Sequence, residues 1–134
     1  MMLNGALGGL VAITAEPLMP TPLMAIIIGG IGGALVFAGT ELLTAMKIDD
    51  VVGAIPVHLI AGVWGTLAVP ITNPDTSFGT QFLGTASICV FVFVVSIIIW
   101  SIMKATIGIR ISEEAEKEGT DVAETGVIAY SIRD

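Results

Sequence analysis

Apolar residues fill four long stretches of the chain, and short clusters of proline and polar residues separate them. The apolar stretches cover about residues 1–15, 21–46, 51–71 and 79–107. The separating clusters read EPLMPTP (16–22), KIDD (47–50) and TNPDTS (72–77), and their composition is typical of turns. Crossing a bilayer takes about 20 apolar residues. The last three stretches are therefore long enough to form transmembrane helices, and the first is too short.

This pattern predicts an all-α integral membrane protein with a transmembrane bundle over 1–107 and an acidic tail over 108–134. The bundle would hold three full membrane-spanning helices and one shortened helix at the N-terminus. The first stretch lacks the basic start of a signal peptide. We therefore interpret it as the last part of a helix whose beginning is absent, which predicts a chain truncated at its N-terminus.

Composition supports a membrane location. Hydrophobic residues make up 54% of the 134 residues and charged residues only 13%, about half of the ~25% found in soluble domains. The net charge is −7, and seven of the twelve acidic residues lie in the tail, so nothing resembles a basic nucleic-acid-binding surface. The single cysteine, Cys89, lies inside an apolar stretch and indicates neither a disulfide framework nor a cysteine metal site.

The basic residues predict the orientation. If the tail is cytoplasmic, alternating helices bring all five lysine and arginine residues to the cytoplasmic side. The two loops on the other side, 16–22 and 72–78, carry none. This distribution follows the positive-inside rule. It predicts a multi-pass protein of the plasma or inner membrane with a cytoplasmic C-terminus.

Small residues spaced four apart predict close helix packing. The pairs are Gly5 with Gly9, Gly29 with Gly33, and Ala61 with Gly65. Such spacing places small side chains on one helix face, so that two backbones can approach closely. The glycines can equally clear space along a pathway for a solute, and the residues alone leave both interpretations open.

The only histidine, His58, lies in the third apolar stretch. Asp49 or Asp50 is suited to cap the start of this helix. His58 follows Asp50 by eight residues, which is about 12 Å along a helix and close to the middle of the bilayer. Its neighbours one turn away are Ala54 and Gly62, so the ring would face a partner helix or a cavity. Pro56 would bend the helix here if it lies beyond the first turn. A pathway role and a purely structural interhelical hydrogen bond remain equally open.

Three motifs of this chain resemble a known family. They read NGALGGLVAITA (4–15), IDDVVGAIPVHLIAGVWGTLAV (48–69) and TIGIRISEEAEKEGTDVAETGVIAY (106–130). In their order and spacing they resemble the ammonium transporters of the Amt/Mep/Rh superfamily. The resemblance covers residues 3–130 and corresponds to the carboxy-terminal part of such a transporter. It implies a trimer in which each subunit has its own pore, within a bundle usually of eleven helices.

The resemblance implies a role for His58 as the second of two pore histidines, whose partner belongs to an earlier helix outside this chain. It implies ammonium or ammonia as the substrate. The residues themselves contain no metal-site, nucleophile–base or phosphate-loop pattern, so we expect no metal, no cofactor and no enzymatic activity. The resemblance also implies that the tail couples subunits and can respond to a trimeric nitrogen-regulatory signal protein. The tail residues that match the family pattern are Arg110, Glu113, Glu114, Gly119, Asp121, Gly126 and Tyr130.

Two functions therefore follow from the sequence. The first is ammonium or ammonia transport, with this chain as one part of the pore. The second is a non-transporting fragment, or an interaction module that associates with intact transporter subunits. We expect the isolated chain not to transport, because a complete pathway would need groups from other helices.

Overall fold

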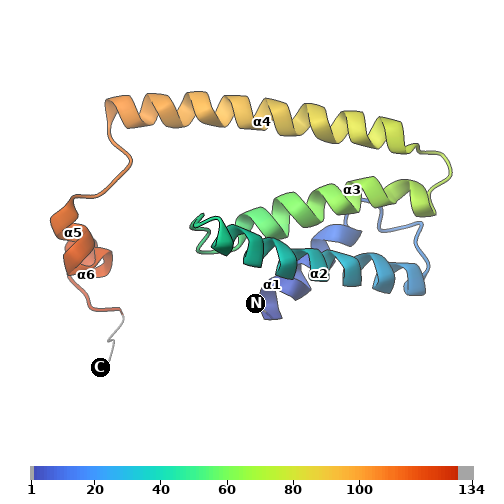
Figure 1. Cartoon of the computed structure of the whole chain (residues 1–134), viewed down its shortest axis with the longest axis horizontal. Coiled ribbons are helices and arrows are strands. Elements are labelled where there is room, and N and C mark those ends of the chain that lie inside the picture. Colours follow the sequence, from blue (N-terminus) through green and yellow to red (C-terminus); the bar gives the residue numbers. More distant parts are fainter. Residues whose placement is uncertain (1, 130–134) are drawn as a thin grey trace. The chain divides into compact units, whose positions relative to one another are not determined.

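The computed structural model describes residues 2–129, and all the regular structure in this range is helical (Figure 1). The elements are α1 (Met2–Ile13), α2 (Pro22–Ala45), η1 (Ile55–Ile60), α3 (Ala61–Thr72), α4 (Phe78–Thr106), α5 (Glu113–Glu118) and α6 (Thr120–Thr125). Element η1 is a π-helix that continues directly into α3.

Within residues 2–129, three helices are long and apolar enough to cross a membrane, as the sequence predicted. They are α2, the continuous helix Ile55–Thr72, and α4. The third apolar stretch differs from the prediction at its start, because the helix begins at Ile55 and not at residue 51. The shorter α1, with 12 residues, is apolar but below the length of a span.

The described chain forms two compact units. The first covers Met1–Phe91 and the second Val92–Asp134, so that the boundary falls inside α4. The first unit contains α1, α2, η1 and α3, which pack against one another. The second contains the rest of α4 and the short tail helices α5 and α6, which contact each other.

Glycines bring α1 and α2 into direct backbone contact. A Cβ built on Gly9 would lie 3.0 Å from the carbonyl oxygen of Gly29, and one built on Gly33 would lie 3.0 Å from that of Gly5. Gly5 contacts Gly33 and Gly9 contacts Gly29. The contacting residues therefore run in opposite order along the two helices, which are antiparallel. Any side chain larger than hydrogen would force the backbones apart, which is why the predicted spacing of small residues produces this contact.

Two small groups of buried residues complete the first unit. One consists of Ala12, Ile28 and Ala68, with Trp64 packed against it. The indole N–H of Trp64 donates a hydrogen bond to the carbonyl oxygen of Ile28 over 3.0 Å. Trp64 thus fixes α3 against α2 through both its ring and its polar atom.

The second group consists of Val36, Val57 and Ala61, which join α2 to η1 and the start of α3. Gly39 lies beside it, because a Cβ there would lie 3.1 Å from the Cβ of Pro56. The histidine-bearing helix is therefore seated on the second half of α2.

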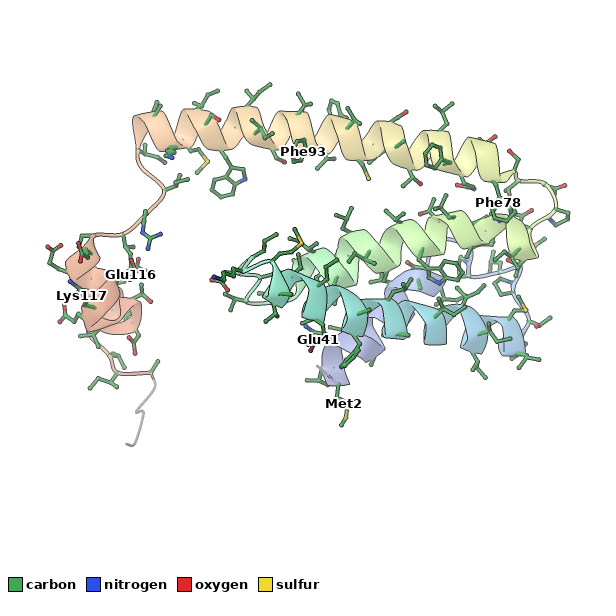
Figure 2. All side chains as sticks on the ribbon, viewed as in Figure 1. Met2, Glu41, Phe78, Phe93, Glu116 and Lys117 are labelled. Atoms are coloured by element: carbon green, nitrogen blue, oxygen red, sulfur yellow. The ribbon has the colours of Figure 1, made fainter. Side chains whose placement is uncertain are left out.

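The helix α4 contains no buried residue along its 29 positions. Side chains project from all sides of it, as the labelled Phe78 and Phe93 illustrate (Figure 2). The most apolar 18 residues of α4 have a mean hydropathy of 2.7, the highest value among the three spans. Such a helix is expected to bury its surface in lipid or against other helices.

Candidate substrate-pathway site

The carboxylate of Asp50 holds the start of the histidine-bearing helix. It accepts hydrogen bonds from the backbone N–H groups of Gly53, Ala54 and Ile55 over 3.1, 2.9 and 2.8 Å. These N–H groups have no partner inside the helix, because its first turn lacks preceding carbonyls. The bond from Ile55, with those from Ala54 and Gly53, lowers the pKa of Asp50 against a smaller opposing effect of desolvation. The predicted helix cap is present.

Pro56 occupies the next position of the same turn. The first regular helical bond here runs from the N–H of Val57 to the carbonyl of Gly53, over 3.1 Å. The nitrogen of Pro56 therefore lies where a backbone N–H would have no helical partner, so its lack of a hydrogen removes no bond. Pro56 is therefore not beyond the first turn, and the condition for a proline-induced bend is not met.

The turn that follows Pro56 is wider than an α-helical turn. The N–H of Ala61 bonds to the carbonyl of Pro56, five residues back, which defines the π-helix Ile55–Ile60 around His58. Isolated π-helical turns occur frequently at functional sites, because the wider turn changes the direction of the side chains that it carries. The sequence contained no signal for this feature.

The imidazole of His58 is exposed on the described chain and does not belong to either buried group. Pro56 and Val57, next to His58 in the chain, contact Gly39 and Val36 of α2. Val36 and Gly39 precede the end of α2 by nine and six residues, or about 9–13 Å at helical rise. The derivation of the predicted depth was wrong, because the chain from Asp50 to Gly53 is a turn and not a helix, and the depth of the ring in a bilayer stays a prediction.

A groove of about 310 Å³ lies beside the histidine within the first unit. Its lining includes His58, Gly62 and Thr66 on one side and Gln81 and Thr85 from α4 on the other. The hydroxyl of Thr85 is buried and has no hydrogen-bond partner among the described residues. Polar atoms and small side chains thus share this groove with the imidazole. Ala54 is exposed and lies outside the groove lining.

A second cavity, of about 370 Å³, lies on the Asp50 side of Pro56. Its lining includes Thr40, Lys47, Asp49 and Asp50. Within residues 2–129, no group of three or more His, Cys, Asp or Glu side chains could hold a metal ion.

Two side-chain bonds between distant segments were not predicted. At one end of the first unit the Asn4 side-chain amide donates to the carbonyl of Val52 over 3.0 Å. At the other end the Asn73 side-chain amide donates to the carboxylate of Glu16 over 2.9 Å. A polar asparagine at the fourth position of an apolar helix was the available signal for the first bond, but the sequence could not indicate its partner.

The tail residues that the sequence singled out lie in and around α5 and α6. Arg110 pairs with Glu116 over 2.6 Å, and Glu113 pairs with Lys117 over 2.7 Å, both on the surface (Figure 2). The carboxylate of Asp121 accepts a bond from the N–H of Ala129 over 2.8 Å.

The remaining tail residues have mainly conformational features. Gly119 and Gly126 adopt positive φ angles of 105° and 68° at the helix ends, which glycine allows without strain. Glu114 is exposed, and Tyr130 lies outside the described residues.

The chain belongs to a family of membrane transporters. Residues 1–130 match the Ammonium Transporter Family. A putative ammonium transporter of Synechocystis is 40% identical over 92% of this chain and 28% of its own length. The ammonium transporter of Bacillus subtilis is 37% identical over 95% of this chain and 35% of its own length. The chain thus spans about a third or less of the length of these relatives.

Proposed function

We propose that this chain forms part of a pathway for ammonium or ammonia across the membrane, and that His58 is one of two histidines that line it. The observation that carries the proposal is the exposed imidazole on a π-helical turn, about 9–13 Å from the end of the neighbouring span. A titratable side chain at this depth is costly in lipid and is expected to face a pathway or a partner helix.

The chemistry of imidazole suits this substrate. A neutral ring donates a hydrogen bond from one nitrogen and accepts one at the other. It can therefore accept a hydrogen bond from ammonium or donate one to the lone pair of ammonia. The small side chain of Gly62 and the hydroxyl of Thr66 lie in the same groove. They leave room for a small solute beside the ring.

The rest of such a pathway would come from polypeptide outside these 134 residues. The match to about a third or less of each relative's length supports this part of the proposal. On this basis the chain corresponds to the carboxy-terminal helices of a transporter subunit and works within a homotrimer. Expressed alone, it should not transport.

The test is a chimera in which this chain replaces the matching segment of the Bacillus subtilis ammonium transporter. Uptake of methylammonium, an ammonium analogue, is measured per molecule inserted in the membrane. We expect the chimera to transport, and His58→Ala to slow uptake at least about tenfold, which corresponds to about 1.4 kcal/mol. Ser101→Ala, at an exposed position of α4, is the control and should leave the rate unchanged.

Equal uptake by the His58→Ala chimera and its parent would refute the role of His58. The chain expressed without further helices should show only background uptake. Uptake above background that His58→Ala abolishes would refute the need for other helices.

We also propose that the tail lies in the cytoplasm and binds a trimeric nitrogen-regulatory signal protein. Two observations support this proposal. Lys47 and Lys104 lie near the ends of α2 and α4, and the positive-inside rule assigns these ends to the cytoplasm. The helix α5 presents charged side chains that a partner protein could bind.

A C-terminal tag should be protected from protease in sealed right-side-out vesicles. Purified regulatory protein should bind inside-out vesicles of the chimera, and Arg110→Ala with Glu114→Ala should weaken that binding. Cleavage of the tag by protease outside these vesicles would contradict a cytoplasmic C-terminus.

A further inference from the structure

The turn that precedes the histidine-bearing helix is held from two directions. From within, the carboxylate of Asp50 accepts the N–H groups of Gly53, Ala54 and Ile55. From α1, the side-chain amide of Asn4 donates to the carbonyl of Val52 over 3.0 Å. The two residues of this second bond lie 48 positions apart in the sequence. Asn4 is thus a side-chain link from α1 to this turn.

The fit around Asn4 is close. Gly53 adopts a φ of 80°, which disfavours any residue with a side chain. A Cβ on Gly53 would also collide with the side-chain nitrogen of Asn4. The glycine therefore both forms the turn and leaves the space through which Asn4 reaches the Val52 carbonyl.

The position of this turn bears on the imidazole. His58 follows Val52 by six residues, and the π-helix that carries it starts directly after the turn. Beyond the turn, Pro56 and Val57 seat the helix on Gly39 and Val36 of α2. Three contacts therefore fix its first turn: Asp50 within the turn, α2 on one side, and Asn4 from α1.

We infer that Asn4 is a positioning residue for His58, acting through the Val52 carbonyl. This inference rests on the proposed function of His58 in transport, although its second test below does not. Asn4 does not lie in the lining of the groove beside His58. Its effect on transport would therefore be indirect, because it fixes the position of the turn that precedes His58.

The first test uses the chimera with Bacillus subtilis, with uptake again measured per inserted molecule. Asn4→Leu removes the donor and keeps the branching and number of side-chain heavy atoms, and Asn4→Asp places an acceptor against the acceptor oxygen of Val52. We expect uptake per molecule to fall about tenfold or more in Asn4→Asp and somewhat less in Asn4→Leu, because small displacements of a reacting group have large effects on rate. A role limited to folding would lower the amount inserted and leave the rate per molecule unchanged, which would overturn the inference.

The matched control is Glu16→Ala. It removes another side-chain bond between distant segments, the one from Asn73 at the opposite end of the first unit. Its rate per molecule should stay within about twofold of the parent, since the turn before His58 is untouched. If Glu16→Ala lowered the uptake rate per molecule as much as Asn4→Leu does, the inference would be overturned. The loss of any side-chain bond between segments would then have the same effect.

The second test does not depend on transport. A cysteine replaces His58 in a Cys89→Ser background, and the rate of its reaction with a small thiol reagent is measured with and without Asn4→Leu. We expect the substitution at Asn4 to change that rate at least about threefold, and Glu16→Ala to leave it unchanged. An unchanged rate in Asn4→Leu would overturn the inference. If His58→Ala leaves uptake intact, the proposed function fails, and the labelling rate still decides whether Asn4 positions residue 58.

Discussion

The helices α2 and α4 have similar compositions and very different surroundings. Both are long and apolar, with mean hydropathies of 2.1 and 2.7 over their spans. Yet Ile28, Gly32, Val36 and Gly39 of α2 are buried residues, whereas no residue of α4 is buried as a whole. The difference lies in glycine contacts, because Cβ atoms on most α2 glycines would meet the backbone or side chains of another helix, while Gly84 of α4 has open space around it. Hydropathy therefore identifies a span, and the placement of small residues indicates whether it packs within this chain.

The contrast between the packed α2 and the unpacked α4 predicts its largest effect on stability at Gly32. A Cβ there would lie 2.6 Å from the Cβ of Ala12 and 2.9 Å from the carbonyl oxygen of Gly8. Gly32→Ala should therefore force α1 and α2 apart and destabilise the first unit by about 1–3 kcal/mol. Unfolding of the purified protein in mixed detergent micelles measures this loss.

Two controls accompany Gly32→Ala. Gly30 on the same helix and Gly84 on α4 have nothing within 4 Å of a built Cβ. Gly30→Ala and Gly84→Ala should leave stability unchanged or raise it slightly, because alanine favours helix more than glycine does. If Gly30→Ala destabilised the protein as much as Gly32→Ala, the contrast between packed and open glycines would be wrong.

The two tryptophans give a second, smaller test. Trp64→Phe removes the hydrogen bond to the Ile28 carbonyl while keeping most of the ring packing. We expect a loss of about 0.5–1.5 kcal/mol in the same unfolding measurement. Trp100 on α4 is 56% exposed, so Trp100→Phe should change the free energy of unfolding far less. Equal losses at the two positions would show that Trp100 of α4 is packed as tightly as Trp64, which joins α3 to α2.

A pH dependence should appear at the start of the histidine-bearing helix. Because the folded state lowers the pKa of Asp50, its capping contribution is in place above the ordinary value of 3.8. It is lost as the pH falls below that value, through the lowered folded-state pKa. Hydrogen exchange at the Gly53, Ala54 and Ile55 amides should therefore accelerate only in strong acid.

Asp50→Asn should remove that acid dependence and speed exchange of the same three amides at neutral pH. Asp49→Asn is the control, since the carboxylate of Asp49 makes none of these three bonds. Amides that exchange equally fast in the Asp50→Asn protein and its parent would contradict the capping role.

The smallest effect is expected in the second unit. Arg110 and Glu116 form an ion pair, but their side chains are 77% and 52% exposed. Arg110→Ala should change stability by less than about 1 kcal/mol, because surface ion pairs are weak and screened by salt. Circular dichroism of the protein across a range of salt concentrations checks this, and a large loss of helix would show that the tail depends on the pair.

The sequence alone determined the membrane class and the three spans, and it drew attention to small residues four apart, because hydropathy and residue spacing are local properties. It also singled out His58 and offered Asp49 or Asp50 as a helix cap. Only the tertiary structure decided that the helix begins at Ile55 after a turn, so that Pro56 removes no hydrogen bond. It alone showed the π-helix around His58 and the bond from Asn4 to Val52. The bond from Asn4 joins residues 48 positions apart, and no local pattern records which distant partner a side chain meets.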